Sequence, residues 1–130
     1  MNAKQLYTYL STKYNNHYFG SYEELNIILD NATLPCIVVI PVLKQVSFIA
    51  NRFKIVESVV VASLAKMDLD FSTSAIYDVV NTLENSLLAN LYPYEHEILS
   101  YQSISELNKF DAGVVFAAFS IDIVNNPICL

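Results

Sequence analysis

The side chains best suited to metal chemistry in this 130-residue sequence are two histidines and the acids beside one of them. His96 lies between Glu95 and Glu97, and all three are residue types that bind metal ions. We predict a strand here, on which the two glutamates share one face while His96 points to the other. His17, the only other histidine, has no metal-ligand spacing to this triplet. The pattern therefore favours a solvated stretch over a metal site.

Other catalytic patterns are equally weak. Cys36 lies inside an apolar run typical of a buried strand, where a thiol is inert. Gly20 and Gly113 are the only glycines, so the sequence lacks a glycine-rich phosphate loop. Asp68 and Asp70 share one face of a predicted strand, and we interpret them as an acidic surface rather than a catalytic pair. The sequence thus predicts a protein that is not an enzyme, with no catalytic, cofactor-binding or metal-binding residues.

The composition indicates one folded domain over residues 1–130. Hydrophobic residues make up 54% of the chain and charged residues only 15%, a balance that excludes a disordered protein. The formal charge of −6 disfavours a protein whose main task is to bind nucleic acid. No apolar run is long enough for a secretory signal or a membrane span, which predicts a protein of the cytoplasm. In that reducing compartment we expect Cys36 and Cys129 to be unpaired.

The first half of the chain predicts two helices and two strands. Apolar spacing indicates a helix over about 3–14, and the capping pattern of Ser21 and Glu24 indicates a second over about 22–30. Pro35 opens a strand, Cys36–Ile40, whose continuous apolar character predicts burial on both faces. A second strand is expected within Phe53–Phe71. Because residues 44–51 contain no glycine, we expect an extended excursion between these strands rather than a tight hairpin.

The second half predicts a long helix and more strands. A helix over 73–91 follows from an apolar stripe with helical spacing: Ile76, Val79, Val80, Leu83, Leu87, Leu88 and Leu91. The more polar segment 95–110 suits an edge strand or strand pair, and alternation from Val115 to Ile123 predicts a final strand that Asn125-Asn126-Pro127 closes. The predicted fold class is α+β: an antiparallel or mixed sheet packed by one long helix (about 73–91), with an N-terminal helix.

Two segments carry residue types typical of protein interfaces. Five of the nine tyrosines fall within the first 22 residues, and of these Tyr9 and Tyr18 do not belong to the apolar stripe of the first helix. They pack either on their own sheet or on a neighbouring subunit. The excursion Lys44–Lys54 combines apolar anchors with charge and predicts a contact with a partner; its candidate residues are Lys44, Phe48, Ile49, Arg52 and Phe53.

The order of elements, together with Phe19-Gly20-Ser21, Glu24-Leu25-Asn26 and Pro35 at the start of the first strand, resembles the tail-terminator and head–tail joining proteins of long-tailed bacteriophages. The resemblance covers nearly the whole chain. It implies a virion protein of the tail or neck, assembled in the host cytoplasm without cofactors. It also implies a homo-oligomeric ring, often a hexamer, that contacts the tail tube and the neck or connector proteins through the excursion and the sheet surfaces.

One further class stays open from the residues alone. A small acidic binding module, such as an immunity or inhibitor protein, would present its acids to a basic partner as a monomer. The two hypotheses share the absence of sequence-specific nucleic-acid binding and of a membrane anchor. They differ in quaternary state, because only the first requires self-association.

Overall fold

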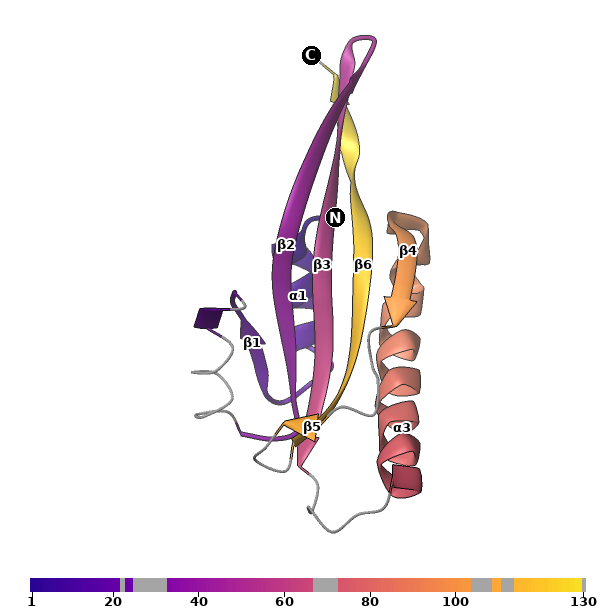
Figure 1. The fold of residues 1–130 in the computed structure, drawn as a ribbon. Helices are drawn as coiled ribbons and strands as arrows, with labels where there is room; N and C mark the ends of the chain where they lie inside the picture. Colours follow the sequence, from indigo (N-terminus) through magenta and orange to yellow (C-terminus); the bar gives the residue numbers. More distant parts are fainter. Residues whose placement is uncertain (22, 25–32, 67–72, 104–108, 111–113, 130) are drawn as a thin grey trace.

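The computed structural model describes residues 1–21, 23–24, 33–66, 73–103, 109–110 and 114–129 (Figure 1). Two helices, α1 (Ala3–Ser11) and α3 (Thr73–Leu91), accompany a sheet. A 3₁₀ segment, η1 (Tyr92–Glu97), follows α3 directly. The strands are β1 (His17–Phe19), β2 (Cys36–Ile49), β3 (Arg52–Lys66), β4 (Ile98–Ser103), β5 (Lys109–Phe110) and β6 (Val114–Cys129).

The sheet is mixed, which confirms the predicted α+β class. Its strands follow the order β1-β2-β3-β6-β4, and β5 pairs with β6 off this path. β1 runs parallel to β2, and every other pairing is antiparallel. The long strands β2, β3 and β6 thus form the centre of the sheet, with the short strands β1 and β4 beside them over part of their length (Figure 1).

Both described helices pack on one face of this sheet. Leu6 and Leu10 of α1 and Leu87 and Leu91 of α3 are fully buried, in one cluster with side chains from β2, β3 and β6. Nearer its N-terminus α3 buries Ile76 and other residues against the same face of β6. Residues of this face alternate along the strands: Ile37, Val39, Val59, Val61, Val115, Ala117, Phe119, Ile121 and Ile123.

The opposite face of the same strands is also buried near their ends. Cys36, Val38 and Ile40 of β2 are nearly inaccessible, in a cluster with Leu64 of β3 and Ala118 of β6. Since Ile37 and Val39 are buried on the helix face, the run Cys36–Ile40 is buried on both faces, as its continuous apolar sequence predicts. The Cys36 thiol is free, and burial raises its pKa to about 11.

The connection between the first two long strands corrects the sequence-based prediction. Instead of an extended excursion, β2 and β3 form a hairpin whose last pair is Ile49↔Arg52, leaving only Ala50 and Asn51 in the turn. Ala50 takes a φ of 53°, in the left-handed region that glycine usually occupies. Pro41 lies at a register shift between Pro41 and Leu43, beyond which the pairing of β2 with β3 continues.

The structure also changes the bounds or type of several other predicted elements. α1 is shorter than predicted, and β1 was not anticipated. Glu95-His96-Glu97 lies in η1 rather than on a strand, and β6 continues through Asn125-Asn126-Pro127 to Cys129. At the predicted capping box, the Glu24 amide donates to Ser21 Oγ at 3.3 Å, but the rest of the predicted helix 22–30 lies outside the described residues.

Among the helices described, none has the length and apolar character needed to cross a membrane.

Candidate interaction surface

The most prominent surface feature is the far part of the β2–β3 hairpin, residues 41–56, which we call the arm. β1 pairs with β2 only at residues 37–39, and β4 reaches along β6 only as far as Ile123. Beyond these points, within the described residues, β2 and β3 continue with β6 as the only third strand, up to the pair Arg52↔Cys129. The arm therefore projects past the helices and the short strands, with its tip near the C-terminal end of β6 (Figure 1).

The outer strand of the arm exposes apolar side chains. All β2 residues from Pro41 to Phe48 are exposed, and the ring of Phe48 is 72% accessible. Three other large apolar residues are more than half exposed: Val42, Leu43 and Val46. Isolated apolar residues on a surface are normal, but a contiguous set on one strand marks a contact site.

Four of the predicted interface residues lie at the tip of the hairpin: Phe48, Ile49, Arg52 and Phe53. The ring centroids of Phe48 and Phe53, paired across the two strands, lie 6.4 Å apart, and Phe53 is partly buried. Arg52 is exposed beside the turn and pairs through its backbone with Ile49, whose side chain lies outside the described part of the structure. The sequence analysis expects these residues on a loop, whereas they belong to two paired strands.

Lys44 marks the base of the arm. Its Nζ lies 3.8 Å from Oε1 of Glu57, while the rest of the lysine side chain is exposed. Glu57 is almost completely buried, and its Oε2 accepts a hydrogen bond of 3.1 Å from the Ala3 amide at the start of α1. One carboxylate therefore connects the arm, the central strand and the N-terminus of α1, where an acidic group is favoured by the free amides of the first turn.

The two candidate tyrosines are engaged within the fold. Tyr9 Oη donates to the Asn90 carbonyl at 2.7 Å, and its ring packs edge-on against Tyr94 with centroids 4.6 Å apart. Desolvation, followed by the nearby Tyr94 and Tyr14, raises the pKa of Tyr9. Tyr18 packs against the cluster around Cys36, and its Oη accepts from the Thr33 amide at 3.3 Å. Tyr9 thus packs against α3 and η1, and Tyr18 packs against the β2 cluster around Cys36.

The predicted acidic surface at Asp68 and Asp70 lies outside the described residues. A different acid, Asp122, is held in the sheet by two serines: Oδ1 accepts from Ser58 at 2.6 Å and Oδ2 from Ser100 at 3.3 Å. This contact joins β3, β6 and β4 across the strands. No pattern in the sequence indicates this contact, because the three residues are far apart in the chain.

The histidines do not form a chemical site with one another. His17 Nδ1 is hydrogen-bonded to Tyr7 Oη at 2.8 Å, and His96 Nε2 lies 3.7 Å from its neighbour Glu97. In the ranges that the structure describes, no three residues among His, Cys, Asp and Glu lie close enough to hold a metal ion.

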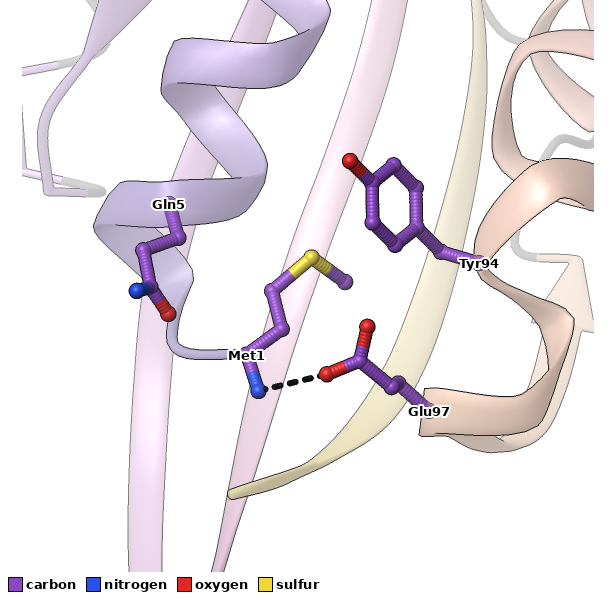
Figure 2. Close-up of a pocket in the computed structure, with 4 residues that line it drawn as sticks. All are labelled: Met1, Gln5, Tyr94 and Glu97. Atoms are coloured by element: carbon purple, nitrogen blue, oxygen red, sulfur yellow. Dashed lines mark hydrogen bonds and ion pairs between the residues drawn. The ribbon is translucent and has the colours of Figure 1, made fainter. Parts of the chain in front are cut away.

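A small recess lies between the start of α1 and η1, lined by Met1, Gln5, Tyr94 and Glu97 (Figure 2). The Met1 nitrogen lies 2.8 Å from Glu97 Oε1 and 3.2 Å from the Val124 carbonyl oxygen. Gln5 Oε1 accepts from the Asn2 amide at 2.9 Å. The polar groups of the recess are therefore used to fasten the first turn of α1 to η1 and β6, a structural role.

No protein-family model, no curated protein and no solved structure matches this chain. The architecture itself defines an α+β domain with a projecting, partly apolar β arm. The arm is the described feature that combines exposure, apolar area and charge in one place.

Proposed function

We propose that this protein is a non-enzymatic structural subunit that assembles into a homo-oligomeric ring, in the role of a tail terminator or head–tail connector of a long-tailed bacteriophage. In this role the ring caps the tail tube or joins it to the neck. The observation that carries the proposal is the arm, whose strand β2 exposes Val42, Leu43, Val46 and Phe48. The specific place in a virion rests on the resemblance of the element order to that family.

Self-association is supported by the free energy that it costs to leave the apolar side chains of the arm in water. Burial of apolar area contributes about 25 cal/mol per Å², so four exposed large side chains on one strand favour association. The exposed edge of β2 adds to this, because an edge strand presents backbone donors and acceptors that a second chain can pair with. Pro41 and Lys44 lie on this edge, and both residue types limit uncontrolled strand addition. These features are typical of a strand that contacts one specific partner, rather than of a strand that stays exposed to water.

The overall charge supports a protein partner over a nucleic acid. Thirteen acids oppose seven bases in the chain, a balance that repels a phosphate backbone. In the proposed role the partners are copies of this chain, the tail tube and the neck proteins, within a virion assembled in the host cytoplasm.

The test is the mass of the purified protein by sedimentation velocity, for the wild type and for Phe48→Asp. We expect the wild type to form a ring of several subunits. Phe48→Asp introduces a charge at the most exposed ring of the arm, and we expect subunits that keep the wild-type circular dichroism but no longer associate. Phe48→Leu, which keeps an apolar side chain, is the matched control and should still assemble. A folded Phe48→Asp protein that assembles as well as the wild type would remove the arm from the interface.

The second candidate, a small acidic binding module, is favoured by one observation. Residues 73–103, which include α3 and β4, contain four acids and no lysine or arginine. A basic protein partner would recognise such a surface. If the wild type is a monomer at every concentration, self-assembly is refuted and this second function becomes the better explanation.

A further inference from the structure

The outer edge of β2 has no partner strand along the arm among the described residues. β1 pairs with β2 only as far as Phe19↔Val39, and Figure 1 shows β1 beside the part of β2 that lies far from the turn. Every β2 residue from Pro41 to Phe48 is exposed. An edge strand of this kind presents backbone donors and acceptors that a further strand can bind.

A hydrogen bond beside β1 shows which β2 residues direct their backbone groups to this edge. The Val39 carbonyl accepts from the Gly20 amide at 3.2 Å, so Val39 faces the edge. The backbone groups of successive residues alternate in direction along a strand. Ile40 therefore turns its own groups towards β3, where its partner is Val60.

The register shift of β2 then moves this alternation by one residue. Val60 and Ser58 of β3 both direct their backbone groups to β2, and the partner of Ser58 beyond the shift is Leu43. Leu43 therefore faces β3, and the following residues alternate from it. The residues of the arm that direct backbone groups to the outer edge are Lys44, Val46 and Phe48.

This edge is complementary to a second copy of itself. Between the register shift and the turn, β2 runs from Leu43 to Ile49, and Val46 is its midpoint. In an antiparallel pair centred on Val46, Lys44 of one copy lies opposite Phe48 of the other, and the two Val46 residues face each other. All of these residues face the edge, so each pair exchanges two backbone hydrogen bonds.

The side chains that lie opposite one another in this pair are also compatible. Lys44 lies on the sheet face that carries the helices, because its Nζ is 3.8 Å from Oε1 of Glu57, whose Oε2 accepts from the first turn of α1. Phe48 shares this face, so a lysine meets an aromatic ring, which is a favourable cation–π pair. On the opposite face, Gln45 of one copy meets Ser47 of the other, and both side chains can form hydrogen bonds.

The outer edge of β6 is less suited to strand addition. Its pairing with β4 ends at Ile98↔Ile123, and the next carbonyl, that of Val124, already accepts from the Met1 nitrogen at 3.2 Å. Pro127 has no N–H to donate. Of the two outer edges of the arm, β2 therefore carries the better site for a second copy.

We propose that the β2 strands of two copies of this chain pair antiparallel along their arms, centred on Val46, and join the two sheets into one. This inference rests on the proposed self-assembly and names the strand edge that carries it. Because the paired segment lies far out on each arm, the two bodies lie at opposite ends of the joined sheet. The contact is isologous and joins two copies, so a ring is assembled from such pairs.

The first experiment removes one outward N–H and leaves the pairing of β2 with β3 intact. Val46→Pro lacks this donor and places its ring where the second copy would lie, a substitution that edge positions tolerate. We expect wild-type circular dichroism and an association weakened about tenfold or more in sedimentation velocity. Val46→Thr, which keeps the N–H and the β-branched shape, is the matched control and should associate as the wild type does.

The second experiment reads the register through two exposed positions of the arm. In a Cys129→Ser background, Gln45→Cys and Ser47→Cys proteins are mixed in air, which places the two thiols opposite each other at a separation within disulfide range. We expect the mixture to form disulfide-linked dimers about tenfold faster or more than either protein alone, because like positions are two residues out of register. Electrophoresis without reductant measures the rates.

The outcomes separate this contact from the proposed function. If Phe48→Asp dissociates the assembly while folded Val46→Pro assembles as the wild type does, the arm is an interface but the β2 edge is not. If the mixture forms disulfides no faster than the separate proteins, the antiparallel register is refuted, whether or not Val46→Pro folds. A monomeric wild type would instead refute the proposed function itself.

Discussion

At the scale of residues, burial in the folded chain decides how much each side chain of the apolar stripe stabilises α3. Leu83 and Leu87 both belong to that stripe, but Leu87 is fully buried, whereas Leu83 is only partly buried. We expect Leu87→Ala to lower the free energy of unfolding by about 2–5 kcal/mol, because it leaves a cavity in the core. Leu83→Ala should cost less. Urea titrations followed by circular dichroism measure both, and equal losses would contradict the packing described here.

A second prediction concerns the Cys36 thiol, which is free, buried and shifted to a pKa of about 11. In a Cys129→Ser background it is the only thiol, and we expect a thiol reagent at about pH 8 to modify it slowly in the folded protein and rapidly in urea. Since the unfolded thiol ionises first, stability should fall as the pH rises from about 9 towards about 11. Cys36→Ala removes this thiol and is the control for the pH dependence. Rapid modification of the native protein would show that Cys36 is accessible.

The residue types of Tyr9 and Tyr18 do not by themselves predict what these side chains contact. Tyr9 and Tyr18 are amphipathic side chains that suit an interface or a core edge equally well. Their hydroxyl partners, the Asn90 carbonyl and the Thr33 amide, come from other parts of the chain. Only the folded structure brings these groups together.

At the scale of elements, the hairpin between β2 and β3 is the feature that the sequence concealed. Tight hairpins normally carry glycine or asparagine where φ is positive, and this turn places Ala50 there. The Cβ atom makes that conformation unfavourable by about 1 kcal/mol. The missing glycine is therefore the reason why the sequence predicts an extended excursion here.

This turn gives a prediction. Ala50→Gly should raise the free energy of unfolding by about 0.5–1 kcal/mol, because glycine adopts the φ of 53° without a steric penalty. Ala50→Val should lower it, since a β-branched residue is least suited to positive φ. Both variants are measured by urea unfolding of subunits dissociated by Phe48→Asp, so that assembly does not alter the result. A stabilising Ala50→Val substitution would argue against a left-handed residue in this turn.

Elements with a strong periodic signal were predicted well. The stripe from Ile76 to Leu91 gave the bounds of α3, and the unbroken apolar run Cys36–Ile40 gave a strand buried on both sides. The segment 95–110 had no clear period, and it contains both η1 and the edge strand β4. Strand β1, only three residues long, is defined by its pairing with β2 rather than by any pattern of its own.

At the scale of the whole molecule, the body and the arm should differ in local stability. The residues Val59–Leu64 of β3 lie between two strands under packed side chains, whereas the arm lacks helix cover among the described residues. In dissociated Phe48→Asp subunits we expect hydrogen exchange of arm amides to be at least about tenfold faster than that of β3 amides in the body. In the assembled wild type the arm should become protected. Equal exchange in arm and body would contradict this division.

The sequence by itself determined what depends on neighbours along the chain: the α+β class, the position of α3 and the doubly buried strand. These follow from the period of apolar side chains, which is a local property. Only the tertiary structure decided that β2 and β3 pair to their ends, that β6 extends the sheet along the arm, and that Glu84 meets β4 through Ser103. These arrangements depend on strand pairing between distant residues, whose partners no local pattern specifies.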